Sequence, residues 1–296
     1  MADGFNVTFS IRPSVRIIPV GCDATVDESL TSPSHVSAAL ESAVFHSTSP
    51  VRALVLTNPH NPFARCYDKS VVAACAQFCQ KYNLHFISDE VYALSTFGEG
   101  HREDGEPEFP SSALKLDVQS LGVDHKRVNV IWSTSKDFGS SGIRLGAVIS
   151  QANERLRISL ALASNIQVSS LAAIATTGLL KSPDLDHLIS LNKQRLKEAH
   201  RNITAFLKSH GVHYIPATAG PFIFAKLPRY VSSLAVEQQL VEMFASEGVI
   251  VSPGTNYAWT KNEFGWIRIT FALQPNVLEE GLERLARGLN AIRKKM

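Results

Sequence analysis

The sequence is poor in cysteine, and its few cysteines are not spaced for metal or disulfide chemistry. Four occur among 296 residues, namely Cys22, Cys66, Cys75 and Cys79. They form no C-x-x-C pair, and no His/Cys cluster has zinc spacing. Cys75 and Cys79 are four residues apart on a predicted helix, so we expect them to pack as small apolar side chains in a reducing compartment. The pattern predicts neither a metal site nor a disulfide framework.

Charge is also sparse and evenly balanced. Charged residues make up 19% of the chain, the net charge is +2, and lysine and arginine are scattered. Nucleic-acid-binding proteins carry clustered basic residues, so we expect no nucleic-acid partner. The short basic run at residues 293–295 is expected to be a solvated helix end.

Long apolar runs and targeting segments are absent too. No uninterrupted apolar run is long enough to span a bilayer, and the first residues, M-A-D-G-F-N-V-T-F, lack the pattern of a secretory signal. The hydrophobic share of 45% is nevertheless enough for a sizeable core. We therefore expect a soluble, cytoplasmic protein with no membrane partner, built as one large domain or two of ordinary size.

What the sequence does contain is an alternation of short apolar runs with longer amphipathic segments. Strands are expected at residues 14–20, 52–56, 84–87, 127–131 and 145–149, and helices at 34–45 and 69–81. This alternation favours an α/β fold with a mainly parallel sheet. Residues 98–110 are polar and rich in glycine and proline, so a loop is expected there.

The pattern changes after about residue 153. Helical stretches are expected at 153–180 and 183–210, short strands at 222–226 and 266–271, and a final helix at 277–295. We therefore predict a large domain at residues 1–182 and a smaller C-terminal α+β domain at residues 183–296.

Three of the predicted strands end in polar side chains. These are Asn58, Asn61, Asp89, Tyr92, Ser133, Ser135 and Lys136. In open α/β sheets, ligands bind beyond the carboxyl ends of the strands. Each group also has a structural alternative, because N-P-x-N-P is a turn formula, Asp89 suits a helix cap, and a lysine in a turn is commonly a surface residue. The combination indicates a site more strongly than any one part.

Lys136 is the most informative of these residues. It lies in W-S-T-S-K-D-F-G-S-S-G-I-R-L-G (132–146), directly after a strand expected to be buried. A lysine in apolar surroundings is costly unless it is paired or neutral, and a neutral amine is a nucleophile that forms imines. An imine-forming amine, a carboxylate, a phenol, an amide, hydroxyls and Arg144 together meet the needs of pyridoxal 5′-phosphate.

The chain resembles the fold-type I pyridoxal-phosphate enzymes, the class I and II aminotransferases in particular, and within them the 1-aminocyclopropane-1-carboxylate synthase-like branch. The segments that carry the resemblance are T-N-P-H-N-P (57–62), F-I-S-D-E-V-Y (86–92), S-T-S-K-D-F-G-S-S-G-I-R-L-G (133–146), S-P-G-T (252–255) and G-W-I-R-I-T-F-A (265–272). They occur in the family's order and cover nearly the whole chain. The resemblance implies the family's large domain, with its mainly parallel sheet, and a smaller α+β domain.

The resemblance also implies roles for the matching residues around the cofactor ring. Lys136 is expected to be the Schiff-base lysine, which then moves protons. Asp89 is expected to hold the pyridine nitrogen protonated. Tyr92 and Asn61 are expected to donate hydrogen bonds to the phenolate oxygen.

Further roles concern the two anionic groups. The resemblance implies that Ser133, Ser135 and Arg144 contact the phosphate. It implies that Arg268 grips the substrate α-carboxylate with two parallel hydrogen bonds, a task that suits a guanidinium. The structural alternative for Arg268 is a strand arginine paired with a surface carboxylate.

The first residues of the chain depart from the family. Residues 4–20 match a segment that lies well inside the family's large domain. Upstream, the family carries a small-residue turn that binds the phosphate, an aromatic residue that stacks on the ring, and an arm that completes the substrate pocket and the dimer. We therefore expect an N-terminally shortened chain, which leaves open a truncated gene model or fragment, a shortened enzyme, and a degenerate paralogue.

The function implied by the resemblance is that of a pyridoxal-phosphate enzyme acting on an α-amino acid, expected to be a homodimer. We expect an aminotransferase or a C–S-lyase-like enzyme of small-molecule, secondary metabolism. One alternative is 1-aminocyclopropane-1-carboxylate synthase. An alternative of another class is a non-catalytic scaffold or partner of a full-length relative.

Overall fold

The chain divides into two units. The computed structural model describes residues 15–21, 25–98, 112–227, 231, 233–257 and 264–294. We call Val20–His60 with Arg65–Asn192 the large unit, and Asn61–Ala64 with residues 15–19 and the described residues from 193 onward the small unit. The division falls between Asn192 and Lys193, and the domain boundary predicted at residue 182 stays a prediction.

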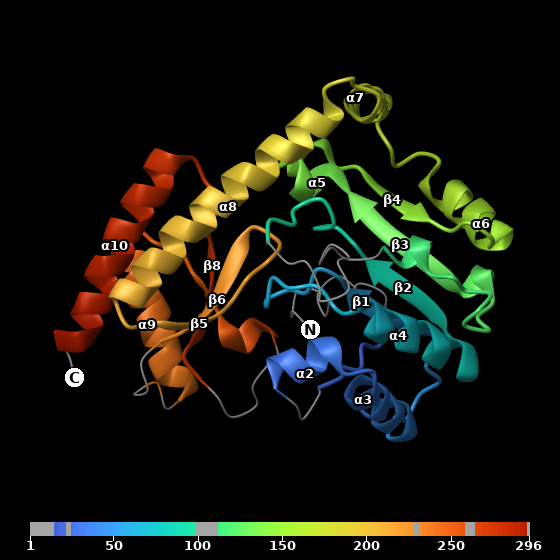
Figure 1. The fold of residues 1–296 in the computed structure, drawn as a ribbon, viewed down its shortest axis with the longest axis horizontal. Helices are drawn as coiled ribbons and strands as arrows, with labels where there is room; N and C mark the ends of the chain where they lie inside the picture. Colours follow the sequence, from blue (N-terminus) through green and yellow to red (C-terminus); the bar gives the residue numbers. More distant parts are fainter. Residues whose placement is uncertain are drawn as a thin grey trace. The chain divides into compact units, whose positions relative to one another are not determined.

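A four-stranded sheet runs through the large unit in the order β1-β2-β3-β4 (Figure 1). Its strands are β1 (Ala53–Thr57), β2 (His85–Asp89), β3 (Val128–Ser133) and β4 (Gly146–Ile149). The first three are parallel, and β4 runs antiparallel to β3. Branched and aromatic residues, which suit a pleated surface, dominate β3 (V-N-V-I-W-S). The predicted α/β fold with a mainly parallel sheet is confirmed.

The helices of the large unit begin at recognisable capping signals. They are α2 (Val26–Thr31), α3 (Pro33–Phe45), α4 (Lys69–Lys81), α5 (Thr134–Asp137), α6 (Glu154–Ser164) and α7 (Ser170–Leu180). Thr25 and Glu28 form a capping box at the start of α2, each side chain accepting from the other's backbone N–H. Pro33 opens α3, where a missing N–H is harmless.

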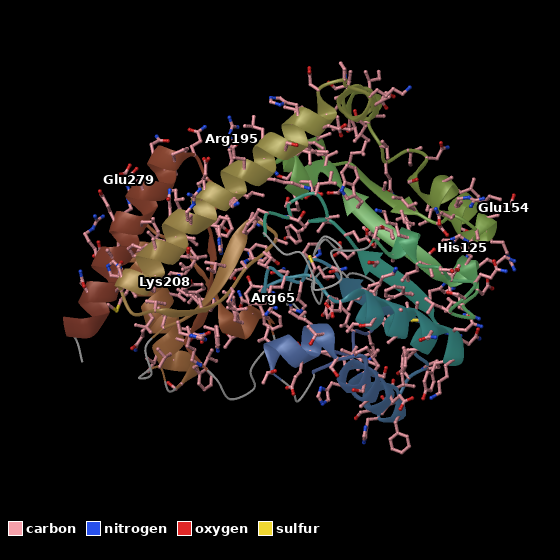
Figure 2. All side chains as sticks on the ribbon, viewed as in Figure 1. Arg65, His125, Glu154, Arg195, Lys208 and Glu279 are labelled. Carbon is pink, nitrogen blue, oxygen red and sulfur yellow. The ribbon has the colours of Figure 1, made fainter. Side chains whose placement is uncertain are left out.

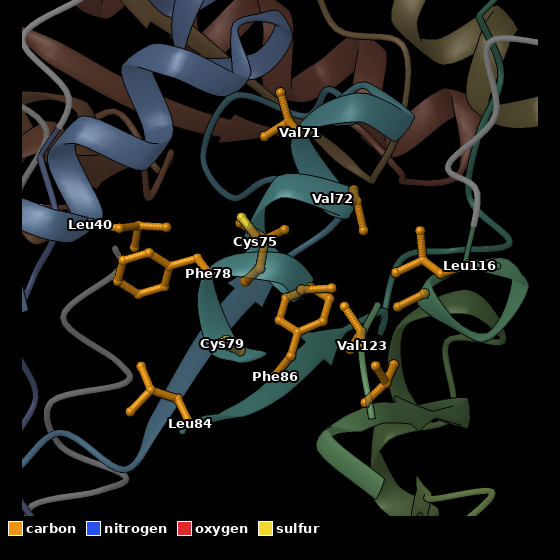
Figure 3. Close-up of a cluster of buried hydrophobic side chains, with 14 of the residues drawn as sticks. Leu40, Val71, Val72, Cys75, Phe78, Cys79, Leu84, Phe86, Leu116 and Val123 are labelled. Carbon is orange, nitrogen blue, oxygen red and sulfur yellow. The ribbon is translucent and has the colours of Figure 1, made fainter. Parts of the chain in front are cut away.

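Helix α4 supplies much of the core of the large unit. Figure 3 shows its apolar side chains beside those of α3, β2 and the segment before β3; the labelled residues are Leu40, Val71, Val72, Cys75, Phe78, Cys79, Leu84, Phe86, Leu116 and Val123. Burying a side chain of the size of Phe86 contributes about 1.5–3 kcal/mol. Cys75 and Cys79 are fully buried free thiols, so their predicted apolar packing is confirmed. Cys22 lies outside the described residues.

The small unit holds an antiparallel sheet in the order β5-β6-β8-β7. Its strands are β5 (His213–Ile215), β6 (Phe222–Lys226), β8 (Trp266–Thr270) and β7 (Ser252–Pro253), and its helices include α9 (Leu234–Ser246) and α10 (Pro275–Lys294). Helix α8 (Leu185–Ser209) contributes residues to both units. Charged side chains such as Arg195, Lys208 and Glu279 project outward from α8 and α10 (Figure 2), while the apolar stripe of α10 is buried. This unit has the α+β character that was predicted.

Several predictions of local structure need correction. Residues 15–20 belong to no helix or strand, because Pro19 cannot donate to a sheet ladder. Helix α9 was not predicted, although Ser233 caps it by accepting a hydrogen bond from Val236 N. The helical region expected at 153–180 is two helices separated by residues 165–169. Ser14, Lys295 and most of the loop expected at 98–110 lie outside the described residues.

Candidate active site

The carboxyl ends of the three parallel strands are aligned in the large unit. Thr57 pairs with Asp89 across β1 and β2, and Asp89 pairs with Ile131 across β2 and β3. The alignment continues past the strands, because Asn58 N donates to the Asp89 carbonyl at 2.9 Å and Glu90 N donates to the Ile131 carbonyl at 2.8 Å. Groups that are distant in sequence therefore gather at one edge of the sheet.

Asp89 lies at this edge in a position unfavourable for a free carboxylate. The residue is only 8% exposed, and among the described residues its side chain accepts one long hydrogen bond, from Val91 N at 3.4 Å. Burial raises the pKa of Asp89 to about 6, with a smaller rise from neighbouring Glu90 opposed by the Val91 hydrogen bond. A cationic partner would stabilise the carboxylate and lower this pKa.

The residues after β2 turn back toward the interior. Tyr92 is buried in this turn, and its carbonyl accepts a hydrogen bond from Ser95 N at 3.0 Å. Glu90, also buried, accepts from Ala113 N at 2.8 Å and so anchors the chain that leads toward β3. Tyr92 is thereby held three residues beyond Asp89, at the same strand end.

Lys136 lies in the short helix α5, immediately after β3. Ser133 Oγ caps this helix by accepting from Ser135 N at 3.0 Å, and both serines are half-buried. Lys136 itself is exposed. The prediction from the sequence that its amine lies in apolar surroundings is therefore wrong. The first three residues of β3 are buried and the last three are half-buried, while Lys136 lies on the exposed side of α5, opposite buried Thr134 and Asp137. The buried hydroxyl Oγ1 of Thr134 has no hydrogen-bond partner among the described residues.

Asp137, which was not predicted from the sequence, fixes the position of α5. Its buried carboxylate accepts from Leu94 N at 3.1 Å, from Ser95 Oγ at 2.6 Å and from the Trp132 indole Nε1 at 3.0 Å. These bonds join the segment after β2 to the segment after β3. The only signal in the sequence is an acidic residue next to Lys136 in a turn, which does not reveal these partners.

Arg144 belongs to the loop that returns from α5 to β4. Ser133 and Gly146 are register partners, so residues 134–145 form one closed connection between β3 and β4. Arg144 is exposed, adopts a left-handed conformation (φ 56°), and donates from Nη1 to the Ser141 carbonyl at 2.9 Å. Ser135, Lys136 and Arg144 therefore belong to a single connection, and Ser133 is the last strand residue before it.

The chemistry of these groups fits pyridoxal 5′-phosphate. A buried carboxylate with a raised pKa suits a protonated ring nitrogen. An exposed primary amine suits an aldehyde, and hydroxyls with a guanidinium suit a phosphate. Within the described residues, no group of three or more His, Cys, Asp or Glu side chains is placed to hold a metal ion.

The remaining predicted residues, Asn61 and Arg268, lie together in the small unit. They are 207 positions apart, yet Arg268 Nη1 donates to Asn61 Oδ1 at 2.9 Å. Arg268 Nε is buried and has no hydrogen-bond partner among the described residues. The arginine thus keeps a donor available for a ligand. The alternative considered from the sequence was that Arg268 pairs with a surface carboxylate.

Comparison with protein families gives one match that covers most of the chain. The family model described as aminotransferase class I and II matches residues 10–285. The chain is similar to "Probable aminotransferase aclI" of Aspergillus oryzae, with 44% identity over 96% of the chain and 66% of that protein. It is 43% identical to "Trimodular acetylaranotin synthesis protein ataIMG" of Aspergillus terreus, over 76% of the chain and 25% of that protein. It is 29% identical to "1-aminocyclopropane-1-carboxylate synthase 7" of Arabidopsis thaliana, over 95% of the chain and 62% of that protein.

Solved structures give the same fold. A mutant aspartate aminotransferase of Thermus thermophilus superposes with a TM-score of 0.68 at 21% identity, covering 90% of this chain and 63% of the other. The chain spans 66% of the length of the Aspergillus oryzae relative, which is slightly less than two thirds. None of the described helices is long and apolar enough to cross a membrane.

Proposed function

Because the chain belongs to the class I and II aminotransferase family, whose members depend on pyridoxal phosphate, we propose that it is an enzyme that binds this cofactor through Lys136 and acts on an α-amino acid. The observation that carries the proposal is that the carboxyl ends of β2 and β3 lie side by side. There a buried carboxylate at the end of β2 neighbours the turn after β3 that holds the lysine.

The cofactor supplies an aldehyde and an electron-withdrawing ring, and the chain supplies the groups that hold and use them. We assign Lys136 as the attachment point and as the base that removes the proton from the substrate α-carbon. Asp89 keeps the ring nitrogen protonated. Tyr92 and Asn61 donate hydrogen bonds to the ring oxygen.

The anionic groups have separate partners in the proposal. Ser133, Ser135 and Arg144 hold the cofactor phosphate. Arg268 holds the substrate carboxylate, and its buried Nε without a partner among the described residues supports that role. An unsatisfied buried donor costs about 1–3 kcal/mol, so a ligand that satisfies it gains affinity.

We place the reaction in secondary metabolism, as an amino transfer or a carbon–sulfur bond cleavage. The name of the Aspergillus terreus relative, which refers to acetylaranotin synthesis, supports the metabolic setting. Cyclopropane formation is a second candidate, favoured by the similarity to a 1-aminocyclopropane-1-carboxylate synthase. A non-catalytic scaffold is the remaining alternative. The cytoplasmic location expected from the sequence stays a prediction.

We further propose that the protein acts as a homodimer, as is typical of the family. Helix α6 has no buried residue, and Leu162 on it is 74% exposed. Leu171 on α7 is 78% exposed. Exposed apolar side chains gathered on consecutive helices commonly mark a surface that another chain covers.

Reductive trapping tests the assignment of Lys136. Protein incubated with pyridoxal 5′-phosphate is treated with borohydride, digested and analysed by mass spectrometry. We expect a pyridoxyl adduct on Lys136 and its loss in Lys136→Ala. Lys126→Ala, which removes another exposed lysine of the large unit, is expected to keep the adduct. An adduct on a different lysine, or none at saturating cofactor, contradicts the assignment.

Product analysis then separates the reaction types. Amino transfer converts an added keto acid to its amino acid, whereas carbon–sulfur cleavage releases a thiol and ammonia. A trapped Lys136 with neither of these products, and with no cyclopropane amino acid formed, favours the non-catalytic alternative.

A further inference from the structure

The small unit builds an aromatic support around the guanidinium of Arg268. Its Cζ lies 4.6 Å from the centre of the Phe222 ring and 5.2 Å from the centre of the Tyr257 ring. Aromatic faces attract a guanidinium and favour parallel stacking, which restricts how the arginine fork can rotate.

Hydrogen bonding leaves one edge of that fork available. Nη1 is engaged by Asn61 Oδ1 at 2.9 Å, while the buried Nε has no partner among the described residues. Nε and Nη2 form the side-on edge of a guanidinium, which matches the two oxygens of a carboxylate. These contacts therefore orient Arg268 for a carboxylate and leave this edge for it.

Tyr257 is itself held in place. It is buried, and its hydroxyl donates to Ser252 Oγ at 2.7 Å. Ser252 on β7 is the register partner of Arg268 on β8. The tyrosine is thus tied to the residue that lies directly across the sheet from the arginine it contacts.

A buried carboxylate fixes the two chain segments that meet here. Glu237 on α9 is 1% exposed; its Oε1 accepts from Thr255 Oγ1 at 2.9 Å and its Oε2 accepts from Gly265 N at 2.7 Å. A Cβ on Gly254 would lie 2.5 Å from Trp266 Cβ, so only glycine permits this approach. The turn that ends in Tyr257 and the start of β8 are held by one side chain.

We propose that Tyr257 is a positioning residue that orients the Arg268 fork toward a substrate carboxylate. The inference rests on the proposed function, in which Arg268 binds the α-carboxylate. Tyr257 acts through the arginine and makes the site selective for a carboxylate over a neutral amide.

The test measures binding of maleate, a small dicarboxylate, to the cofactor-supplemented full chain by calorimetry, with maleic diamide as the neutral comparison. We expect Arg268→Gln to weaken maleate binding about 100-fold. Tyr257→Leu, which removes the ring, is expected to weaken it about 10-fold, and Tyr257→Phe about 3-fold. Diamide binding is expected to change little in any variant.

A double-mutant cycle separates positioning from general structural damage. If Tyr257 acts through Arg268, Tyr257→Leu in the Arg268→Gln background weakens binding no further. Tyr214→Leu, a half-buried tyrosine of β5 in the same sheet, serves as the control and is expected to leave maleate affinity unchanged. Phe222→Leu tests the second ring if Tyr257→Leu fails to fold.

Additive losses in the cycle, or unchanged maleate affinity in Tyr257→Leu and Phe222→Leu, overturn the proposal. Failure of the proposed function is recognised separately, because it appears as the absence of the Lys136 adduct. If the Lys136 adduct forms but the cycle shows no coupling between Tyr257 and Arg268, only the role of Tyr257 is rejected. Absence of maleate binding by the unaltered, trapped protein also rejects it.

Discussion

At the scale of the residue, two buried aspartates of the large unit differ in how their charges are satisfied. Asp137 accepts hydrogen bonds from a backbone amide, a hydroxyl and an indole. Among the described residues, Asp89 accepts one, at 3.4 Å. A buried carboxylate that is well hydrogen-bonded stabilises the fold, whereas a poorly satisfied one is destabilising unless a ligand compensates. The contrast suits Asp137 to structure and Asp89 to the cofactor.

The raised pKa of Asp89 gives a pH-dependent prediction for the cofactor-free protein. Its folded-state pKa of about 6 exceeds the ordinary value of 3.8, so between these values the folded state binds more protons than the unfolded state. The stability contributed by Asp89 is therefore greatest below pH 3.8 and is lost as the pH rises through 6. We therefore compare the free energy of unfolding of Asp89→Asn with that of the unaltered protein. The difference is expected to shift in favour of the variant by about 2 kcal/mol from pH 4.5 to pH 7.5.

Urea unfolding of both proteins at the two pH values measures this difference. The difference between the variant and the unaltered protein cancels the contribution of all other titrating groups to the pH dependence of stability. With saturating cofactor, the advantage of Asn at pH 7.5 is expected to shrink, because a protonated ring nitrogen stabilises the carboxylate. A difference that does not vary with pH would show that the Asp89 pKa is not raised.

At the scale of the element, the packing of α9 and α10 depends on one glycine. A Cβ on Gly288 of α10 would lie 2.6 Å from Phe244 Cδ1, and Phe244 of α9 is fully buried. Apart from its chain neighbours and the backbone of its own helix, no atom of the described residues lies within 4 Å of a Cβ built on Gly281 of the same helix. A side chain at position 288 would therefore clash with Phe244, whereas position 281 has room for one.

Alanine substitutions on α10 separate helix propensity from packing. Gly281→Ala is expected to stabilise the protein by about 0.5–1 kcal/mol, because alanine loses less backbone entropy in a helix. Gly288→Ala is expected to destabilise it by about 1–2 kcal/mol, because the added methyl overpacks the contact with Phe244. Thermal unfolding of both variants measures the two effects. Equal shifts of the same sign would show that the close approach to Phe244 has no energetic consequence.

At the scale of the whole molecule, the proposed dimer gives a test of the exposed apolar helices. We expect the double variant Leu162→Glu with Leu171→Glu to be monomeric, because charges at a buried interface lose their solvation. Ile250→Glu changes a 92% exposed apolar residue of the small unit and is expected to leave the dimer intact. Sedimentation equilibrium gives the masses. A dimer that survives the double variant would place the interface elsewhere.

The sequence alone determined the local features of this protein. The apolar spacing at positions 71, 72, 75, 78 and 79 predicted helix α4 with the bounds that the structure has, Lys69–Lys81. Three polar strand ends were predicted for the same reason, since an apolar run followed by turn residues is a local pattern. The roles of Lys136 and Asp89 stay predictions.

Only the tertiary structure decided which distant residues meet. The pairing of Arg268 with Asn61 spans 207 positions, and the donors to Asp137 come from residues 94, 95 and 132. It also showed that Lys136 is exposed between buried neighbours, and that one carboxylate, Glu237, holds two segments beside Arg268. Local patterns record the preferences of neighbours along the chain. Strand register, loop closure and side-chain packing depend on contacts that form only when the whole unit has folded.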